Sequence, residues 1–381
     1  MKVGIVVPYS WSFWGAVLEH AELQADALTR LGIETRSIMG HDPPGTFTSV
    51  LHPRHGRHGR PPPEVLPVGR SVIVPANGSL PNIVLSPSSV VRIKRILERE
   101  RFDVLHLHEP MTPAICTAVL AFARCPIVAT FHASGDLGWM RAATPTWGFL
   151  AERIDHRIAV SEHAATSAQR WLGGEYEIVP NGVLVPPEVD PGGREHRILF
   201  AGRQEPRKGL HVMLRAWPEI RRRTGARLRI VGADPLAVRL LLTRERVAEE
   251  GIDVLGFLEQ DAFTDELAAA KALVAPSLGG ESFGMVLTRA FACATPVVAS
   301  DISGYRDVMT TDTGVLVPPG DPVALADAVV GLVEDEDRRR ALGASARALA
   351  IARYSWDDIG RRLARIYELV AGRAPAGVAA P

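Results

Sequence analysis

The stretch VGIVVPY, residues 3–9, decides the fold, because it is the first of a series of short β-branched runs that alternate with amphipathic stretches. Runs of this length are typical of buried strands, and the amphipathic stretches favour helices. The alternation predicts parallel strands joined by helices. The later runs in the first half of the chain are SVIV at 71–74, DVLHL at 103–107, PIVATF at 126–131 and RIAV at 157–160.

The alternation starts again at RILFAGR, residues 197–203, and continues with RLRIVG at 227–232, DVLG at 253–256, ALVAPS at 272–277 and TPVVAS at 295–300. Residues 179–196 concentrate Pro, Gly and Asn, a composition typical of a connector. We therefore predict an α/β protein of two Rossmann-like, doubly wound domains, residues 1–188 and 189–354. The helical pattern at 355–373 predicts a final helix that completes the first domain.

The charge composition argues against nucleic acid as a partner. Lys plus Arg and Asp plus Glu both total 43 in 381 residues, so any anionic ligand must be recognised locally. The three cysteines lie in apolar stretches and suit a reducing compartment. The chain begins unlike a signal peptide and has no apolar run of about 20 residues. We expect a cytoplasmic protein, with a peripheral position at the inner face of the cell membrane left open.

The stretch GRQEPRKG, residues 202–209, carries the first set of candidate site residues. It follows a predicted strand and groups Arg203, Arg207 and Lys208 beside two glycines and the start of a helix. In open α/β sheets, ligands bind at the carboxyl ends of strands. This position favours a diphosphate ligand over a solvated basic turn.

A second candidate stretch is SLGGESFGMVL, residues 277–287, which follows another predicted strand. Its paired glycines allow the backbone to approach a ligand, and Glu281 offers a carboxylate to sugar hydroxyls. The amides around Phe283 to Met285 open a helix whose positive end favours an anion. By spacing alone such a loop is weak evidence, because many loops look similar.

The first domain offers two weaker candidates. His132 follows the strand PIVAT and suits contact with a sugar or proton transfer, although a lone histidine is more often packed or exposed. Gly15 precedes a predicted helix, so its amide can approach a diphosphate.

No metal site is predicted. Residues 42–70 are rich in Pro, Gly, Arg and His and suggest a long surface loop, in which His52, His55 and His58 are solvated. The acidic triplet at 335–337 suggests a charged turn between helices.

Taken together, these stretches resemble the retaining glycosyltransferases of family 4. EPRKG with LGGESFG is specific at the level of the family. The resemblance implies two Rossmann-like domains that face a central cleft, the GT-B arrangement. It is strongest with actinobacterial members that transfer mannose from GDP-mannose to phosphatidyl-myo-inositol. The similar stretches span nearly the whole chain: VPYS, FDVLHLHEP, PIVATFH, RIAVSE, VPNGV, EPRKG, LRIVG, LGGESFGMVL and PVVASD.

The resemblance also implies residue roles. It assigns Arg203 and Lys208 to the donor diphosphate and Glu281 to the hydroxyls of the transferred sugar, with His132 beside that sugar. With these four as the catalytic set, the donor contacts also include Gly15, Gly232, Phe283, Gly284, Met285 and Arg289.

The chain departs from the family at three places. Arg289 stands where a second glutamate usually touches the donor ribose, eight positions after Glu281. Ala16 replaces a glycine that usually follows Gly15. Gln260 and Phe263 stand where the mannosyltransferase relatives present charged groups near the nucleobase.

The implied reaction is a retaining, same-face transfer in which the leaving phosphate helps to deprotonate the acceptor, while Arg203 and Lys208 stabilise the departing charge. The co-substrate is a nucleotide sugar, and no tightly bound cofactor is expected. The acceptor is a lipid or a polyol on the side of Tyr9. Residues 88–100 predict a capped basic helix whose Arg92, Lys94 and Arg95 suit an anionic membrane surface, although an ordinary solvated helix explains the same pattern.

Three rival readings remain open. One is a family 4 enzyme with another nucleotide sugar and a soluble acceptor. Another is a donor-binding protein without turnover, which Arg289 and Ala16 motivate. The third is a nucleotide-sugar epimerase, which needs acids placed for proton transfer and no acceptor; the EPRKG cluster argues against it.

Overall fold

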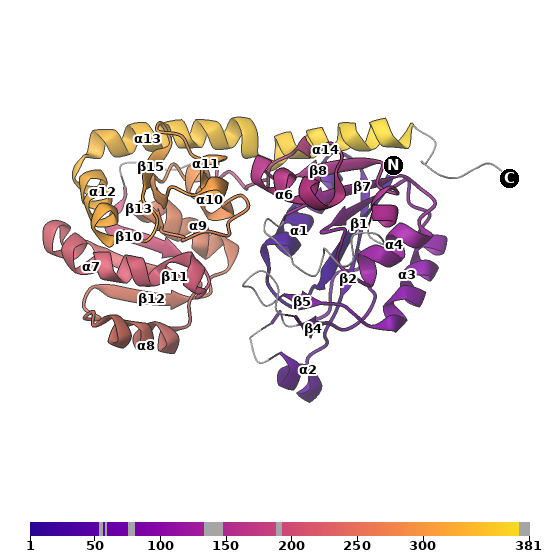
Figure 1. Cartoon of the computed structure of the whole chain (residues 1–381), viewed down its shortest axis with the longest axis horizontal. Coiled ribbons are helices and arrows are strands. Elements are labelled where there is room, and N and C mark those ends of the chain that lie inside the picture. Colours follow the sequence, from indigo (N-terminus) through magenta and orange to yellow (C-terminus); the bar gives the residue numbers. More distant parts are fainter. Residues whose placement is uncertain (53–55, 58, 75–80, 133–147, 188–192, 373–381) are drawn as a thin grey trace. The chain divides into compact units, whose positions relative to one another are not determined.

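The computed structural model describes residues 1–52, 56–57, 59–74, 81–132, 148–187 and 193–372. The chain forms two compact units (Figure 1). Unit 1 comprises residues 1–182 and 356–381, and unit 2 comprises residues 183–355. The first boundary therefore lies a little before residue 188, and the C-terminal helix belongs to unit 1.

The main sheet of unit 1 is parallel, with strand order β3-β2-β1-β6-β7-β8-β9. A short antiparallel pair, β4 with β5, joins it where Tyr9 of β1 pairs with Ile83. The run at 71–74 was expected to be a parallel strand, which is wrong: an apolar run signals a strand but not its partner. The strands are β1 Lys2–Ser10, β2 Glu34–Gly40, β3 Val65–Pro67, β4 Val72–Ile73, β5 Asn82–Ile83, β6 Val104–His108, β7 Ile127–Phe131, β8 His156–Ala159 and β9 Glu177–Ile178.

Helices cover both faces of this sheet (Figure 1). One face packs on α3 and α4, around Leu105 and Ile127 of the sheet. The other packs on α1 and the C-terminal helix α14, whose Trp356, Leu363 and Val370 share one core with Ile5 of β1. The final helix thus completes unit 1. The helices are α1 Ala16–Arg30, α2 Thr46–Leu51, α3 Pro87–Glu100, α4 Ile115–Phe122, α6 Glu162–Leu172 and α14 Trp356–Ala371.

The sheet of unit 2 is fully parallel, with strand order β12-β11-β10-β13-β14-β15. The order reverses beside β10, which is where doubly wound sheets form their ligand sites. α7, α8 and α12 fill one core with the sheet. The strands are β10 Glu195–Ala201, β11 Arg227–Val231, β12 Ile252–Gly256, β13 Ala270–Ala275, β14 Val297–Ser300 and β15 Gly314–Val317.

The helices of unit 2 include a 3-10 turn, η1, over Pro206–Lys208, and a π-helical segment, η2, over Ala350–Tyr354 that leads toward α14. Asp335 caps α13 by accepting a hydrogen bond from the Arg338 amide, so the acidic triplet lies at the expected helix junction. The α-helices are α7 Leu210–Thr224, α8 Pro235–Glu245, α9 Gln260–Ala269, α10 Met285–Ala292, α11 Ser303–Arg306, α12 Pro322–Glu334 and α13 Glu336–Leu349.

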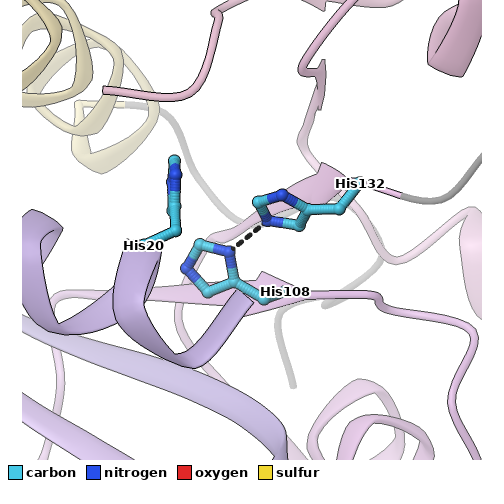
Figure 2. Close-up of side chains that lie close together, drawn as sticks. All are labelled: His20, His108 and His132. Carbon is cyan, nitrogen blue, oxygen red and sulfur yellow. Dashed lines mark hydrogen bonds between the residues drawn. The ribbon is translucent and has the colours of Figure 1, made fainter. Parts of the chain in front are cut away.

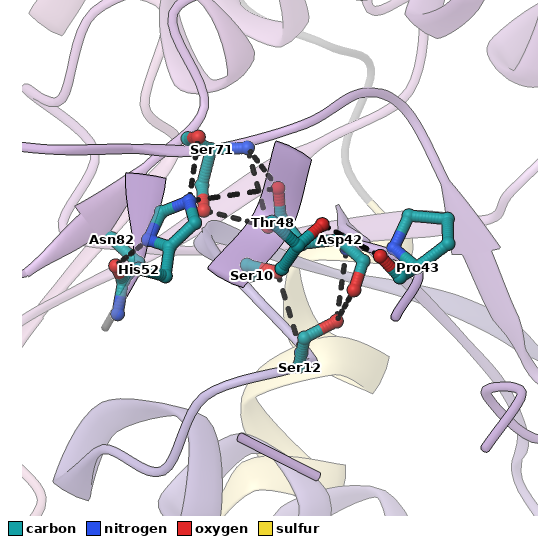
Figure 3. Close-up of polar contacts among 8 residues, drawn as sticks. All are labelled: Ser10, Ser12, Asp42, Pro43, Thr48, His52, Ser71 and Asn82. Carbon is teal, nitrogen blue, oxygen red and sulfur yellow. Dashed lines mark hydrogen bonds and ion pairs between the residues drawn. The ribbon is translucent and has the colours of Figure 1, made fainter. Parts of the chain in front are cut away.

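The segment 42–70 was predicted to be a surface loop with solvated histidines, and this is wrong for its described part. It contains α2 and β3, and His52 is buried. Figure 3 shows the reason: the Asp42 carboxylate accepts hydrogen bonds from the Ser71 amide and hydroxyl, and His52 Nδ1 lies 2.8 Å from Asn82 Oδ1. Mutual hydrogen bonding allows these polar groups to be buried. His55 and His58 lie outside the described residues.

Among the described residues, no helix combines the length and the apolar character needed to cross a bilayer.

Candidate active site

In unit 2 the candidate residues lie just beyond the ends of two neighbouring strands. Arg203 to Lys208 follow β10, and Glu281 follows β13. These two strands pair directly, at the point where the strand order reverses. The Leu278 amide donates to the Arg207 carbonyl at 2.7 Å, which ties the two loops together. The topology therefore brings together two motifs that are about 70 residues apart in the sequence.

Glu281 lies at the centre of this group, with only 9% of its surface exposed. Its Oε1 lies 2.7 Å from Lys208 Nζ and 2.9 Å from Arg207 Nη1, and it accepts a hydrogen bond from the Ser277 hydroxyl at 3.3 Å. Two cations therefore flank one buried carboxylate, whose oxygen accepts charge-assisted hydrogen bonds from both. Lys208 and Glu281, which were both predicted to belong to the site, are therefore in direct contact.

Arg203 lies beside this group. Its guanidinium pairs with Glu205 at 3.1 Å, and Glu205 also pairs with Arg207 at 2.8 Å. The side chain of Arg203 remains 45% exposed. Arg203 thus lies at the edge of the cluster, with its side chain partly exposed to solvent.

Glycines set the backbone of this site. Gly209 has φ +73°, and a Cβ there would lie 1.8 Å from the Pro276 carbonyl oxygen. Gly284 has φ +80° and precedes α10, whose first residue is Met285, so the expected helix start is confirmed. A Cβ on Gly284 would meet the Tyr305 ring at 2.8 Å. Only glycine fits either position without strain.

The other predicted donor contacts of unit 2 surround this backbone. Gly232 follows β11 with φ +87°, and its amide donates to the Gly256 carbonyl at 2.7 Å. Phe283 is buried, with its ring edge-on to Tyr354 at a centroid distance of 5.7 Å. Phe283 therefore supports the start of α10 by packing, while the backbone amides of that turn carry the polar character.

Arg289 lies one turn into α10, and its guanidinium stacks on the Phe263 ring at 5.3 Å from the centroid. Burial lowers the pKa of this guanidinium. Two of the residues that depart from the family pattern, Arg289 and Phe263, are therefore in contact with each other.

Unit 1 holds the other predicted residues. His132 directly follows β7 and is 9% exposed; its Nε2 lies 2.8 Å from Nδ1 of His108, the last residue of β6. Gly15 is exposed at the N-cap of α1, with extended φ of −167°. Tyr9 lies near the end of β1, and burial together with the Glu109 carboxylate raises the pKa of its phenol.

The histidine is part of a larger uncharged group. His20 of α1 lies edge-on to His132 at a centroid distance of 4.9 Å, and His106 stacks on His108 at 4.7 Å (Figure 2 shows His20, His108 and His132). Burial lowers the pKa of all four imidazoles, to about 3 for His20 and His106. His132 is therefore neutral at physiological pH and offers one donor and one acceptor nitrogen.

Comparison with known proteins shows to which family the chain belongs. A model described as "Glycosyltransferase Family 4" matches residues 19–184, and one described as "Glycosyl transferases group 1" matches residues 195–335. The chain is 35% identical over 384 residues to a phosphatidyl-myo-inositol mannosyltransferase of Mycobacterium leprae, with 97% of each chain covered. The chain belongs to glycosyltransferase family 4.

Two further matches agree with this family. A GDP-mannose-dependent monoacylated alpha-(1-6)-phosphatidylinositol monomannoside mannosyltransferase of Corynebacterium glutamicum is 35% identical over 271 residues, which covers 64% of this chain and 70% of the relative. Sucrose-phosphate synthase of Thermosynechococcus elongatus superposes with a TM-score of 0.74 at 19% identity, covering 98% of this glycosyltransferase and 100% of the synthase. The predicted family and GT-B fold class are confirmed.

The basic helix of this glycosyltransferase differs from the expectation in two respects. α3 begins at Pro87, with Ser86 rather than Ser88 at the N-cap position. Its Ile93 and Ile96 are buried in the core of unit 1, so they cannot contact lipid. The apolar face of α3 packs in the same core as α4, so it is covered by the protein. The cations Arg92, Lys94 and Arg95 are exposed, and among the described contacts none of them forms an ion pair.

Several residues of the site were missed or given no role from the sequence. Arg207 was grouped with the basic cluster, but its contact with Glu281 was not foreseen. Ser277 and Tyr305 form a hydroxyl pair at 2.8 Å behind Glu281. Ser277 follows a strand end, which is a usable signal, whereas nothing in the sequence marks Tyr305. The alternating histidines 106 and 108 share one face of β6, which marks His108 as a neighbour of the site.

Proposed function

We propose that this glycosyltransferase moves mannose from GDP-mannose to the inositol ring of phosphatidyl-myo-inositol, with retention of configuration. The observation that carries the proposal is the buried Glu281 carboxylate, held by Lys208 and Arg207 beside the start of α10. The names of the mycobacterial and corynebacterial relatives support the choice of donor and acceptor.

The charges of unit 2 suggest how each group acts. All three described contacts of Glu281 engage Oε1, which leaves Oε2 to accept a hydrogen bond from a sugar hydroxyl. Lys208, Arg203 and the amides at Gly284 and Met285 stabilise the negative charge that grows on the departing diphosphate. Gly232 lets the backbone approach the nucleotide, and Arg289 with Phe263 contacts the nucleoside.

Unit 1 supplies the remaining groups in this proposal. Neutral His132 contacts the transferred sugar, and the exposed Gly15 amide contacts the diphosphate. Tyr9 lies on the acceptor side. The departing phosphate takes the acceptor proton, so the new bond forms on the face from which the diphosphate leaves.

A matrix of donors and acceptors tests the proposal. GDP-mannose, UDP-glucose and UDP-N-acetylglucosamine are each incubated with phosphatidyl-myo-inositol vesicles, with free myo-inositol and with no acceptor. We expect an α-mannosylated lipid from GDP-mannose alone. Turnover only with a UDP-sugar, or only with free myo-inositol, would replace the donor or the acceptor. Conversion of a donor without acceptor would favour an epimerase.

The acceptor proposal includes a membrane contact through the exposed cations of α3. Each surface Lys or Arg adds about 1 kcal/mol of attraction to an anionic bilayer, within a screening length of about 8 Å. We therefore expect sedimentation with anionic vesicles that weakens as salt rises, and little binding to neutral vesicles.

A triple variant tests this contact. Replacing Arg92, Lys94 and Arg95 by Ser should abolish vesicle binding and preserve nucleotide binding. The control variant removes the same number of exposed cations from α7 of unit 2, by Ser at Arg215, Arg222 and Arg223. Equal vesicle binding by the two triple variants would remove the support for a membrane surface on α3.

A further inference from the structure

Three buried histidines of unit 1 converge from separate elements. His20 comes from α1, His108 ends β6, and His132 follows β7 (Figure 2). Each is less than 10% exposed. The proposed transfer reaction uses His132 alone, so the other two imidazoles have no role in it.

The spacing of the three rings is nearly equal. Their centroids lie 4.9 Å apart for His20 and His132, 5.1 Å for His108 and His132, and 5.3 Å for His20 and His108. One ring nitrogen from each lies within 4.8 Å of the other two. Around a tetrahedral cation bound at about 2.0–2.1 Å, imidazole centroids are about 5 Å apart and the nitrogens about 3.3 Å apart. The ring centroids therefore already have the spacing that three imidazoles take around one such cation.

The protonation and hydrogen bonding of the group also suit a cation. Neutral imidazole is the form that binds a metal ion, and burial holds all three rings neutral. His20 Nδ1 has no hydrogen-bond partner among the described residues, and the His108 nitrogen that faces the group, Nδ1, contacts only another imidazole, that of His132, within the described part of the chain. A buried polar atom without a partner destabilises the folded protein, so it calls for an explanation.

His106 provides the contrast within the same strand. It is equally buried, but Nδ1 contacts the Tyr367 hydroxyl and Nε2 lies 2.7 Å from Thr130 Oγ1. Its two nitrogens are thus satisfied by the protein, as is usual for a structural histidine. His20 and His108 differ from it in this respect.

We propose that His20, His108 and His132 form a binding site for a borderline-soft divalent cation such as Zn²⁺. The cation replaces the proton shared between His108 Nδ1 and His132 Nε2, and water or the neighbouring Asn181 completes the coordination. Because His132 is also the histidine assigned to the sugar, occupancy inhibits transfer; this consequence alone rests on the proposed function.

Zinc titration of the untagged full-length protein tests the site. The protein is stripped with a chelator and titrated with Zn²⁺ by calorimetry, and Co²⁺ is used to read tetrahedral coordination from its visible absorption. We expect one equivalent bound at micromolar or lower concentration. His20→Gln and His108→Gln should each weaken binding at least about tenfold, because each removes one of three ligands.

Two control variants separate the site from other histidines. His196→Gln changes an exposed histidine of unit 2, and His106→Gln changes an equally buried one beside the site. Both should keep the tight zinc equivalent, and circular dichroism with GDP titration checks that every variant is folded. Wild-type affinity in the His20 and His108 variants, or no tight equivalent in the wild type, would overturn the proposal. Zinc binding without inhibition would leave the site standing and contradict the role of His132 in transfer.

Discussion

The two groups of candidate residues, the charged half in unit 2 and the neutral half in unit 1, are built in opposite ways. In unit 2, Glu281 lies within 2.9 Å of two cations, and the polar groups are charged and paired. In unit 1, four imidazoles pack together and burial keeps them uncharged. A site that must bind a diphosphate needs fixed positive charge, because electrostatic stabilisation is strongest when the charges are already in place. A site beside the sugar needs hydrogen-bonding groups without net charge.

This difference explains why the residues of the charged half could be predicted from the sequence, whereas most of those of the neutral half could not. The charged half comes from two contiguous motifs, each of which carries several functional residues. The neutral half takes one residue from each of several distant elements. The predictions below use substitutions that affect one half and spare the other.

The largest effect is expected for the carboxylate and its cation. Glu281→Gln and Lys208→Ala should each lower turnover at least about a hundredfold, since each removes a contact that acts on the reacting group. The measurement is kcat with GDP-mannose, together with a thermal unfolding curve.

The matched control is Glu219→Gln, a half-buried carboxylate on α7 of the same unit that pairs with Arg222. It should keep wild-type turnover. Wild-type rates in the Glu281 and Lys208 variants would remove these residues from the active site.

The backbone of the charged half is expected to be less tolerant than its surroundings. Gly209→Ala places a Cβ 1.8 Å from the Pro276 carbonyl, whereas a Cβ on Gly225 meets nothing within 4 Å; both glycines have φ near +70°. Gly225→Ala should cost about 1–2 kcal/mol of unfolding free energy from the left-handed backbone alone. Gly209→Ala should cost at least about 2 kcal/mol more. Equal urea midpoints for the two variants would contradict the close approach of the two loops.

The neutral half predicts a pH dependence that is larger in unit 1 than in unit 2, where burial lowers the pKa of His211 as well. His20 and His106 have a pKa of about 3 in the folded protein against an ordinary value of 6.5, so the unfolded chain binds more protons between these limits. The free energy of unfolding should therefore fall as pH decreases below about 6.5, by up to about 1.4 kcal/mol per pH unit for each histidine. The ion pair of Asp253 in unit 2, whose pKa is lowered, persists across the same range.

Hydrogen exchange at pH 7.5, 6.5 and 5.5, with a chelator present, measures this difference. Peptides of β6 and β7 should lose protection first, and those of β10 and β11 should keep it. His20→Gln should flatten the dependence, and His196→Gln should not. Parallel loss of protection in both units would argue against the buried neutral histidines as the cause.

The smallest effect is expected at Gly15. Its φ of −167° suits any residue, and a Cβ there meets nothing within 4 Å. Gly15→Ala should leave the unfolding free energy unchanged and weaken GDP-mannose binding about threefold to tenfold if its amide touches the diphosphate, because a methyl group then separates them. Unchanged affinity would remove Gly15 from the donor site.

The sequence alone determined the family, the two α/β units and the charged motifs. Strand runs such as 3–9 and 197–203 are local signals, since burial on both faces of a parallel sheet requires continuous apolar residues. EPRKG and LGGESFG carry their chemistry within a few positions. The helix start at Met285 was predictable as well, because Gly284 and the apolar residues after it are local features.

Only the tertiary structure decided which of these groups touch. The contact of Arg207 with Glu281 depends on the pairing of β10 with β13, and the hydroxyl pair behind it depends on α11. Tertiary contacts also explain why Asp42 and His52 are buried in a segment that looks like a loop, and why His20 packs against His108. The composition and periodicity of a segment predict which of its residues are buried and which are exposed to solvent. The partner of a buried polar group depends instead on the topology of the chain. That partner lies too far along the sequence for a local pattern to predict it.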